Sequence, residues 1–372
     1  MMITANNGFI EQSERYAFDN AGESLKKYIL LQKGELAYNH GASKLRPFGS
    51  CFALTTAESA RIPFVYHCFS AENQNAEFLS IELNGSEVES QLRKIVSSGA
   101  RMDGLLNISF DEYSTVTVLL PDIKEQEHIA DFFRNLDNLI TLHQRKYDKL
   151  QVLKKAMLEK MFPKNGSSVP EIRFKGFTDA WEQRKLGEVV ERITRKNENL
   201  ESTLPLTISA QYGLINQNEF FDKRIASKDV SGYFLVRNGE FAYNKSTSSD
   251  APWGAIKRLD RYESGVLSTL YIVFKILDES KTSSDYIVTY YNTDLWHKGI
   301  QAIAAEGARN HGLLNVAPAD FFETNLTMPK DYAEQQQIGS FFQQLDHLIT
   351  LHQRELEKLQ NIKKSMLEKM FV

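Results

Sequence analysis

Apolar residues recur every three or four positions over two long stretches of this chain. The first stretch contains Ile129, Phe133, Leu136, Ile140, His143, Tyr147 and Leu150, and the second contains Ile338, Phe342, Leu345, Ile349, His352, Leu356 and Leu359. Alternating steps of four and three residues are typical of a coiled-coil seam. The first stretch has no Gly or Pro up to Phe162, and the second has only Gly339 near its start. The pattern predicts two helices of about 37 residues, each roughly 55 Å long at 1.5 Å per residue.

The two helical stretches are copies of one another. Residues 123–162 and 332–371 are identical at 25 of 40 positions with a constant offset of 209. The heptapeptide Leu139–Arg145 returns unchanged as Leu348–Arg354. The preceding segments are also related, because residues 3–39 match 208–244 at 14 of 37 positions. A repeat this long indicates one duplicated module, in which a globular domain precedes a nearly invariant helix.

The repeat divides the chain into five parts. We expect a globular domain over residues 1–122, a helix over 123–162, a linker over 163–169, a second globular domain over 170–331 and a second helix over 332–372. Pro163 ends the first helix, and the Gly and Ser residues that follow are typical of a linker. Residues 116–120 and 271–276 have strand composition. The predicted fold class is α+β, with two mixed α/β domains and a pseudo-two-fold repeat.

Composition and charge exclude several classes of protein. Of the 372 residues, 42% are hydrophobic and 25% are charged, which is ordinary for a globular protein. The chain shows no apolar run of spanning length and no signal sequence, and its two cysteines fit a reducing compartment, so we expect it in the cytoplasm. Its net charge is −4, so DNA binding would need local basic patches or partner subunits.

Motifs for catalysis are absent from the sequence. It contains no Asn-Pro-Pro-aromatic motif, no glycine-rich cofactor loop and no G-x-x-x-x-G-K-[ST] loop. Asp122 and Glu125 are spaced loosely like nuclease carboxylates, but the helix dipole favours acids at a helix start in any case. The eight histidines form no ligand set. His143 and His352 occupy equivalent seam positions, either as an inter-helix pair that fixes the register or as two separate core histidines.

Two further segments resemble a known family. Pro170-Glu171-Ile172-Arg173-Phe174-Lys175-Gly176-Phe177, followed by Trp181 to Glu188, resembles the opening of a target recognition domain in type I restriction–modification specificity subunits. The helix starts at Glu125-Gln126 and Glu334-Gln335, and the repeated Leu-His-Gln-Arg core, resemble that family's central and C-terminal conserved regions. The resemblance covers essentially the whole chain.

The resemblance implies a DNA-binding subunit without catalytic residues or a metal. Two target recognition domains would each read one half of a bipartite double-stranded DNA site, and the two helices would pack as an antiparallel coiled-coil spacer. Methyltransferase (M) and motor-nuclease (R) subunits are the implied partners, and S-adenosylmethionine, ATP and Mg²⁺ would be bound by them and not by this chain. The alternatives are a one-chain restriction–methylation enzyme, a coiled-coil scaffold that binds only protein, and a silent or truncated specificity cassette that needs a second chain.

The repeat also sorts candidate DNA contacts. Polar residues that both halves share are candidates for scaffold roles or for contacts with DNA phosphates, and those that differ are candidates for base readout. Arg101 and Arg309 lie in the same Gly-Ala-Arg motif, and we expect them either to contact phosphates or to support the loop. Asn310, which follows Arg309, is a candidate adenine reader. The loops after the shared Tyr-Asn pairs differ in their basic residues, which are His40, Lys44 and Arg46 in one half and Lys245, Lys257, Arg258 and Arg261 in the other. The Tyr-Asn pairs themselves are expected to be framework.

The alignment of the halves leaves the first domain without a counterpart to one segment. Ile3 matches Ile208, so Met1 corresponds to Leu206 and no first-half residues correspond to the 36 residues 170–205. We therefore expect the first domain to be shortened at its N-terminus, with a naturally shorter domain as the alternative.

Overall fold

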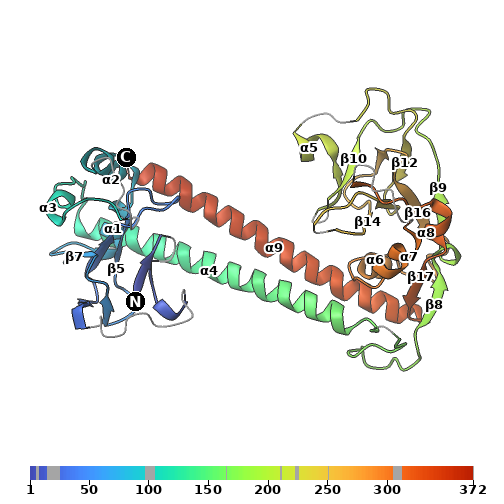
Figure 1. The fold of residues 1–372 in the computed structure, drawn as a ribbon, viewed down its shortest axis with the longest axis horizontal. Coiled ribbons are helices and arrows are strands. Elements are labelled where there is room, and N and C mark those ends of the chain that lie inside the picture. The colour runs from blue at the N-terminus through green and yellow to red at the C-terminus, as the bar shows by residue number, and fades with distance from the viewer. Residues whose placement is uncertain are drawn as a thin grey trace. The chain divides into compact units, whose positions relative to one another are not determined.

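The computed structural model describes residues 1–5, 8–14, 26–96, 105–164, 166–209, 212–222, 226–249, 251–304 and 312–371. The chain divides into two compact units. Unit 1 comprises Met1–Arg145 and His352–Val372, and unit 2 comprises Lys146–Leu351. Each unit contains one globular head and parts of both long helices (Figure 1). We call residues 1–122 the first head and residues 170–331 the second head.

The first head combines small antiparallel sheets with short helices. Its strands are β1 (Met2–Thr4), β2 (Gly8–Ile10), β3 (Ile29–Gln32), β4 (Leu36–Asn39), β5 (Ser50–Ala53), β6 (Ser59–Ile62) and β7 (His67–Phe69). Its helices are η1 (Gln12–Glu14), α1 (Ala76–Glu82), α2 (Ser86–Ile95) and α3 (Phe110–Tyr113). The central sheet has the order β5-β4-β7. Its buried face packs on α2 and α3 through residues such as Leu36, Tyr38 and Leu92.

The second head repeats this plan with additional elements. Its strands are β8 (Glu182–Lys185), β9 (Val190–Ile193), β10 (Leu206–Ser209), β11 (Gly213–Asn216), β12 (Phe234–Arg237), β13 (Phe241–Asn244), β14 (Ala255–Arg258), β15 (Ser264–Leu267), β16 (Ile272–Ile276) and β17 (Asn325–Met328). Its helices are η3 (Leu186–Glu188), α5 (Gln217–Phe221), α6 (Ser284–Tyr290), α7 (His297–Ile303) and α8 (Pro318–Phe322). The central sheet β14-β13-β16-β9 corresponds to β5-β4-β7 with one strand added.

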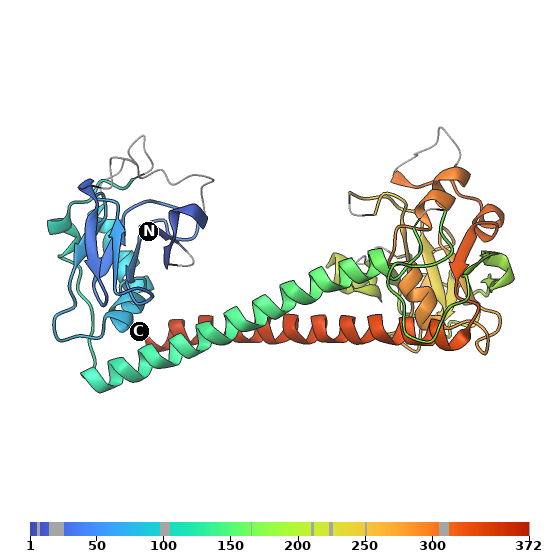
Figure 2. The ribbon, with the colours of Figure 1, turned by 90° about the horizontal axis from the view of Figure 1, so that it is seen from below.

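The long helices are α4 (Ile123–Lys160) and α9 (Tyr332–Met370), and their contacts inside unit 1 show that they run antiparallel. Figure 2 shows α4 and α9 as the two longest helices of the chain. In unit 1, Asp137 accepts a 2.5 Å hydrogen bond from Lys363, and the rings of His143 and His352 are in contact. In unit 2, Lys154 donates a 2.5 Å hydrogen bond to Asp346. In unit 1 the later residue of α4, His143, therefore contacts the earlier residue of α9, His352, as antiparallel helices require. The predicted α+β class with an antiparallel helix pair is confirmed.

One predicted strand does not form. Residues 116–120 form no strand, whereas β16 covers residues 272–276 as expected. In the second head the equivalent segment is β17, which pairs with β8 over Glu182–Lys185. Strand composition alone cannot form a ladder, because a strand needs a partner to accept and donate its backbone hydrogen bonds. No described segment of unit 1 pairs with residues 116–120, so the prediction was wrong.

Candidate nucleic-acid interface

Both heads hold their candidate loops on the same framework. Tyr38 and Tyr243 occupy equivalent places in β4 and β13, and their hydroxyls donate to Phe48 O at 2.6 Å and Trp253 O at 2.9 Å. Each loop then ends at a glycine with positive φ, Gly49 in the first head and Gly254 in the second. A Cβ at either position would lie within 3 Å of the strand backbone and the tyrosine ring. Only glycine fits so close to the backbone in this conformation. The Tyr-Asn pairs are framework, as predicted.

The asparagines of these pairs shape the start of each loop. The Asn39 side chain accepts a hydrogen bond from Gly41 N at 3.0 Å, and Asn244 accepts one from Ser246 N at 3.0 Å. Such side-chain turns imitate a backbone turn and fix the direction in which the chain leaves the strand. The two loops therefore start alike and differ in the residues that follow.

In the first head the three basic candidates lie in different environments. His40 is buried, and its ring nitrogens lie 2.9 Å from Leu106 O and 2.8 Å from Val65 O. Arg46 donates to Asn84 O at 2.7 Å, and burial lowers the pKa of its guanidinium. Lys44 is exposed in the loop. Lys44 is thus the member of this set that presents its charge to solvent.

In the second head most of the basic candidates have partners inside the unit. Lys257 donates to Asn292 Oδ1 at 2.9 Å, and burial, together with the nearby Lys154 charge, lowers the pKa of its ammonium group. Lys245 lies 3.4 Å from Val316 O, and burial lowers its pKa. These two lysines sit between elements of the fold.

Arg258 and Arg261 differ although only two residues separate them. The Arg258 guanidinium binds Asp260 at 2.6 Å, Ser284 at 2.7 Å and Asp285 at 2.8 Å, so it joins the end of β14 to the start of α6. Arg261 is exposed in the turn that follows, and its side chain forms no hydrogen bond with another described residue. Arg101, Arg309 and Asn310, the remaining candidates, lie outside the described residues.

A pair of buried glutamines, which the sequence prediction missed, anchors each head to its long helix. Gln126 in α4 accepts from Asn75 N at 3.0 Å and donates to Pro121 O at 2.9 Å. Gln335 in α9 accepts from Ser283 N at 2.9 Å and donates to Pro329 O at 3.0 Å. Asn75 and Ser283 are the N-caps of α1 and α6. Gln126 and Gln335 occupy equivalent positions of the repeat, and this was the sequence signal that could have pointed to their anchoring role.

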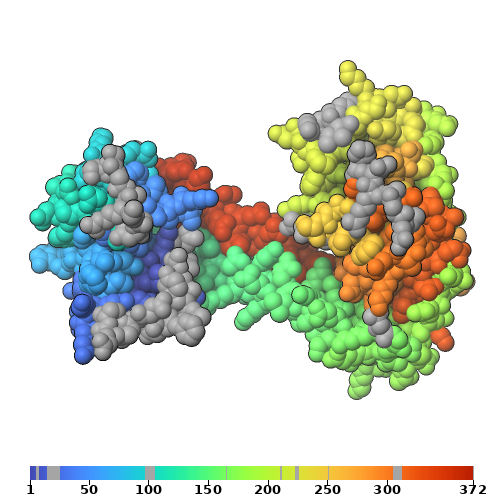
Figure 3. All heavy atoms as spheres, viewed as in Figure 1, coloured from blue at the N-terminus to red at the C-terminus, as the bar shows by residue number. Residues whose placement is uncertain are grey.

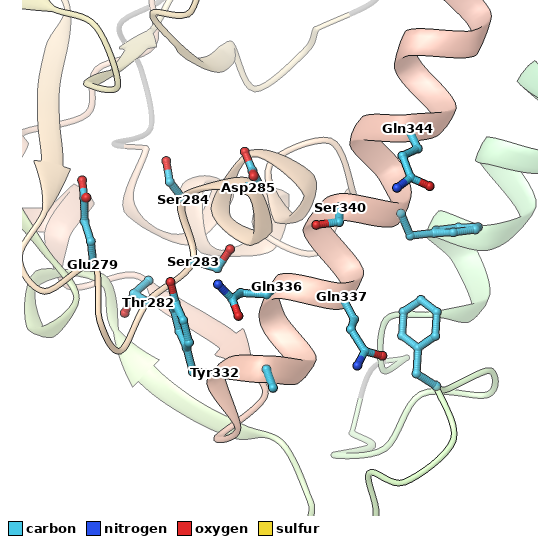
Figure 4. Close-up of a pocket in the computed structure, with 13 residues that line it drawn as sticks. Glu279, Thr282, Ser283, Ser284, Asp285, Tyr332, Gln336, Gln337, Ser340 and Gln344 are labelled. Atoms are coloured by element: carbon cyan, nitrogen blue, oxygen red, sulfur yellow. The ribbon is translucent and has the colours of Figure 1, made fainter.

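A surface cavity lies next to the second of these anchors. It encloses about 740 Å³ between α6 and the first turns of α9, and polar side chains line most of it (Figure 4). Ser284, Asp285 and Gln336 are among the residues at its wall. Among the described residues, no group of His, Cys, Asp and Glu is arranged to hold a metal ion.

The long helices carry a polar contact in unit 1 and a pair of exposed leucines in each unit. In unit 1, the Nδ1 atoms of His143 and His352 lie 3.1 Å apart, which confirms the inter-helix pair among the two alternatives. Leu139 and Leu142 of α4 and the equivalent Leu348 and Leu351 of α9 are exposed. Parts of both helices lie at the molecular surface (Figure 3). Among the described residues, no helix is long and apolar enough to cross a membrane.

Comparisons with known proteins find this architecture in solved structures. No family model matches the sequence, and no curated protein matches it. The type I restriction–modification system S subunit from M. genitalium superposes with a TM-score of 0.56 at 12% identity, covering 93% of this chain and 85% of that one. The chain therefore has the fold of that S subunit.

Two further solved chains align over similar lengths. The HsdS subunit from Thermoanaerobacter tengcongensis has a TM-score of 0.42 at 16% identity, covering 92% of this chain and 81% of that one. A chain from a study of complex assembly and conformational transition of the type I R-M system has a TM-score of 0.44 at 15% identity, covering 92% and 82%.

Proposed function

We propose that this chain is the DNA sequence-recognition subunit of a type I restriction–modification complex and has no catalytic role of its own. The observation that carries the proposal is the fold shared with an S subunit over 93% of the chain. The internal repeat supports it, because two heads on one framework with unlike loops suit two different half-sites on one duplex. Each head reads one half of a bipartite site, and α4 and α9 form the spacer between them.

Lys44 and Arg261 are the first choices for DNA contact among the described candidates. Both are exposed, one in each head, and both follow the shared framework strands. Lys and Arg bind phosphate oxygens or the O6 and N7 atoms of guanine in the major groove. Arg101, Arg309 and Asn310 remain part of the proposal as phosphate contacts and an adenine reader. His40, Arg46, Lys245, Lys257 and Arg258 then support the loops, because their side chains already hold partners within the heads.

The exposed leucine pair of each unit, Leu139 with Leu142 and Leu348 with Leu351, is the proposed docking site for a methyltransferase subunit. The heptapeptide Leu139–Arg145 recurs unchanged in α9, and it places two leucines at the surface in each copy. Exposed apolar patches of this kind mark protein interfaces. Motor-nuclease subunits then join the complex. S-adenosylmethionine, ATP and Mg²⁺ are bound by the partner subunits.

The test is methylation in a host that lacks other type I systems. The chain is co-expressed with its methyltransferase subunit, the complex is purified, and modified adenines are mapped across the host genome. We expect one bipartite motif, and retardation of a DNA fragment that carries it. Replacing residues 39–60 by 244–265 should change one half of the motif only. A chain that copurifies with the methyltransferase but directs no sequence-specific methylation would refute the proposal.

A further inference from the structure

In each head, the loop after the Tyr-Asn pair is joined at its root to the segment that follows the Gly-Ala-Arg motif. In the first head, Gly41 at the start of the loop forms an antiparallel β-bridge with Leu105. In the second head, Ser246 forms the equivalent bridge with Leu313. The Gly-Ala-Arg motifs precede Leu105 and Leu313 in the sequence and lie outside the described residues. Two of the stretches that contain candidate DNA contacts in a head therefore share one root.

A basic residue occupies the same position at each root, next to the bridge. His40 in the first head and Lys245 in the second are equivalent in the repeat. Their carbonyl oxygens accept hydrogen bonds from Leu106 N at 2.8 Å and from Leu314 N at 2.9 Å. Their side chains also reach backbone carbonyls, and the Lys245 ammonium group donates to Val316 O at 3.4 Å. Each root thus holds a side chain that can carry a positive charge.

Both ring nitrogens of His40 lie against backbone carbonyl oxygens. Nδ1 lies 2.9 Å from Leu106 O and Nε2 lies 2.8 Å from Val65 O, and the residue is buried. A carbonyl oxygen can only accept a hydrogen bond, and a neutral imidazole carries only one N–H. Both contacts are therefore hydrogen bonds only when the ring is protonated. In the neutral ring a nitrogen lone pair faces one of the two carbonyl oxygens, and that contact is lost.

The titratable side chains around the His40 ring are another histidine and two tyrosines. His67 on β7 stacks on it with the ring centroids 5.0 Å apart, Tyr38 on β4 lies at 6.4 Å, and Tyr113 on α3 stacks on Tyr38. Burial raises the pKa of both tyrosine hydroxyls, so the tyrosines stay neutral. Burial lowers the pKa of His67, whose neutral ring can still donate from Nε2 to Ile108 O at 3.1 Å. The hydrogen-bond partners described for the two histidine rings are backbone carbonyls rather than carboxylates.

We propose that His40 and Lys245 are positioning residues that clamp the two stretches of their head together, and that the histidine makes the clamp of the first head weaken as pH rises. The consequence for DNA rests on the proposed function. Lysine keeps its charge at neutral pH, whereas histidine usually loses its proton between pH 5 and 8. The protonated His40 ring holds one hydrogen bond more than the neutral ring, so the clamp is strongest at low pH. The clamp of the second head has no such dependence.

Amide hydrogen exchange of the full chain without DNA tests the clamp. The Leu106 amide, which donates to His40 O, is compared with the Leu314 amide, which donates to Lys245 O, at pH 5.5 and 8.0. Rates are corrected for the intrinsic pH dependence of exchange. We expect the protection of Leu106 to fall at least about tenfold as pH rises, because a hydrogen bond from a charged donor changes an opening equilibrium by that factor. The protection of Leu314 should change by less than about twofold.

Two variants separate the two histidines of the first head. His40→Lys introduces the residue of the second head and should keep the protection of Leu106 constant between the two pH values. His67→Gln removes the neighbouring imidazole and should leave the pH dependence of Leu106 in place. A pH dependence that persists in His40→Lys, or vanishes in His67→Gln, would overturn the proposal, as would pH-independent protection in the wild type. If His40→Lys does not fold, the wild-type and His67→Gln measurements decide.

The consequence for DNA is measured with the purified methyltransferase complex. Its affinity for the recognised fragment is divided by its affinity for fragments changed in one half-site, so that general effects of pH on DNA binding cancel. Between pH 5.5 and 8.0, discrimination at the half-site read by the first head should fall about tenfold, and discrimination at the other half-site should change by less than about twofold. Equal changes at both half-sites would contradict the link between the clamp and DNA recognition. A complex that discriminates no sequence would instead refute the proposed function, and the exchange of Leu106 would still test the clamp.

Discussion

The Arg173–Glu334 pair allows a prediction of stability with a defined magnitude. Arg173→Met removes the cation and leaves the Glu334 carboxylate buried beside the Trp181 indole. Breaking a buried ion pair in this way costs about 3–5 kcal/mol, because an uncompensated charge stays in the interior. Replacing both partners by Met and Leu should recover most of that loss, since an apolar pair needs no counter-charge.

Urea unfolding, monitored by tryptophan fluorescence, measures this loss of unfolding free energy. All three tryptophans, Trp181, Trp253 and Trp296, lie in unit 2, so the signal reports that unit alone. At an m-value of about 2 kcal/mol/M, the expected loss lowers the midpoint by roughly 1.5–2.5 M.

The matched control is Lys275→Met, which breaks the 2.6 Å surface pair with Glu191. Exposed pairs contribute about 0–1 kcal/mol, so its midpoint should move by less than roughly 0.5 M. A similarly small shift in Arg173→Met would refute the argument, as would a double variant no more stable than the single one.

Three shorter predictions concern packing, pH and DNA binding. Gly339→Ala places a Cβ 2.6 Å from the nearest atom of α6, so unit 2 should lose about 1–3 kcal/mol in the same urea assay; the reverse change Ala130→Gly in unit 1 should cost about 1 kcal/mol, seen by circular dichroism. Burial lowers the pKa of His67, so the folded first head prefers the neutral ring. The stability that the neutral His67 ring contributes is fully present above its ordinary pKa of about 6.5 and is lost as pH falls through the lower folded pKa. The melting temperature should therefore fall more between about pH 7.5 and 5.5 in the wild type than in His67→Gln. Lys257→Met should leave DNA retardation by the methyltransferase complex within about twofold, whereas Arg261→Ala should weaken it about tenfold, as expected for loss of a base or phosphate contact; equal effects would contradict the assignment.

The sequence predicted the elements whose signals are local or repeated. The apolar period through Ile338, Phe342 and Leu345 predicted α9, and these residues are buried in the core of the second head. Tyr38 and Tyr243 were recognisable as framework because both halves retain them in the same context. In both cases the information lies within a short segment or in its copy.

Contacts between distant segments could not be predicted in the same way. Residues 116–120 have the composition of a strand, but whether a strand forms depends on a partner elsewhere in the fold. Lys257 and Arg258 were predicted as DNA contacts from their charge and position in the repeat, and the fold places Asn292 and Asp285 against their side chains. Both residues lie on β14, and the sequence gives no local sign of such an internal partner. The list of candidate DNA contacts could therefore be ranked only with the structure.

The two buried glutamines bear on how such a protein can change over generations. Both glutamines bind their heads through backbone atoms, namely an N-cap N–H and a proline carbonyl, and Gln126 adds one side-chain hydrogen bond to Gln74. Head sequences that place a proline shortly before the long helix and cap a helix nearby can satisfy that requirement. A genetic crossover near the start of α4 or α9 would therefore join a foreign head to a resident helix with the anchor intact. The helices can be inherited almost unchanged while the heads are replaced.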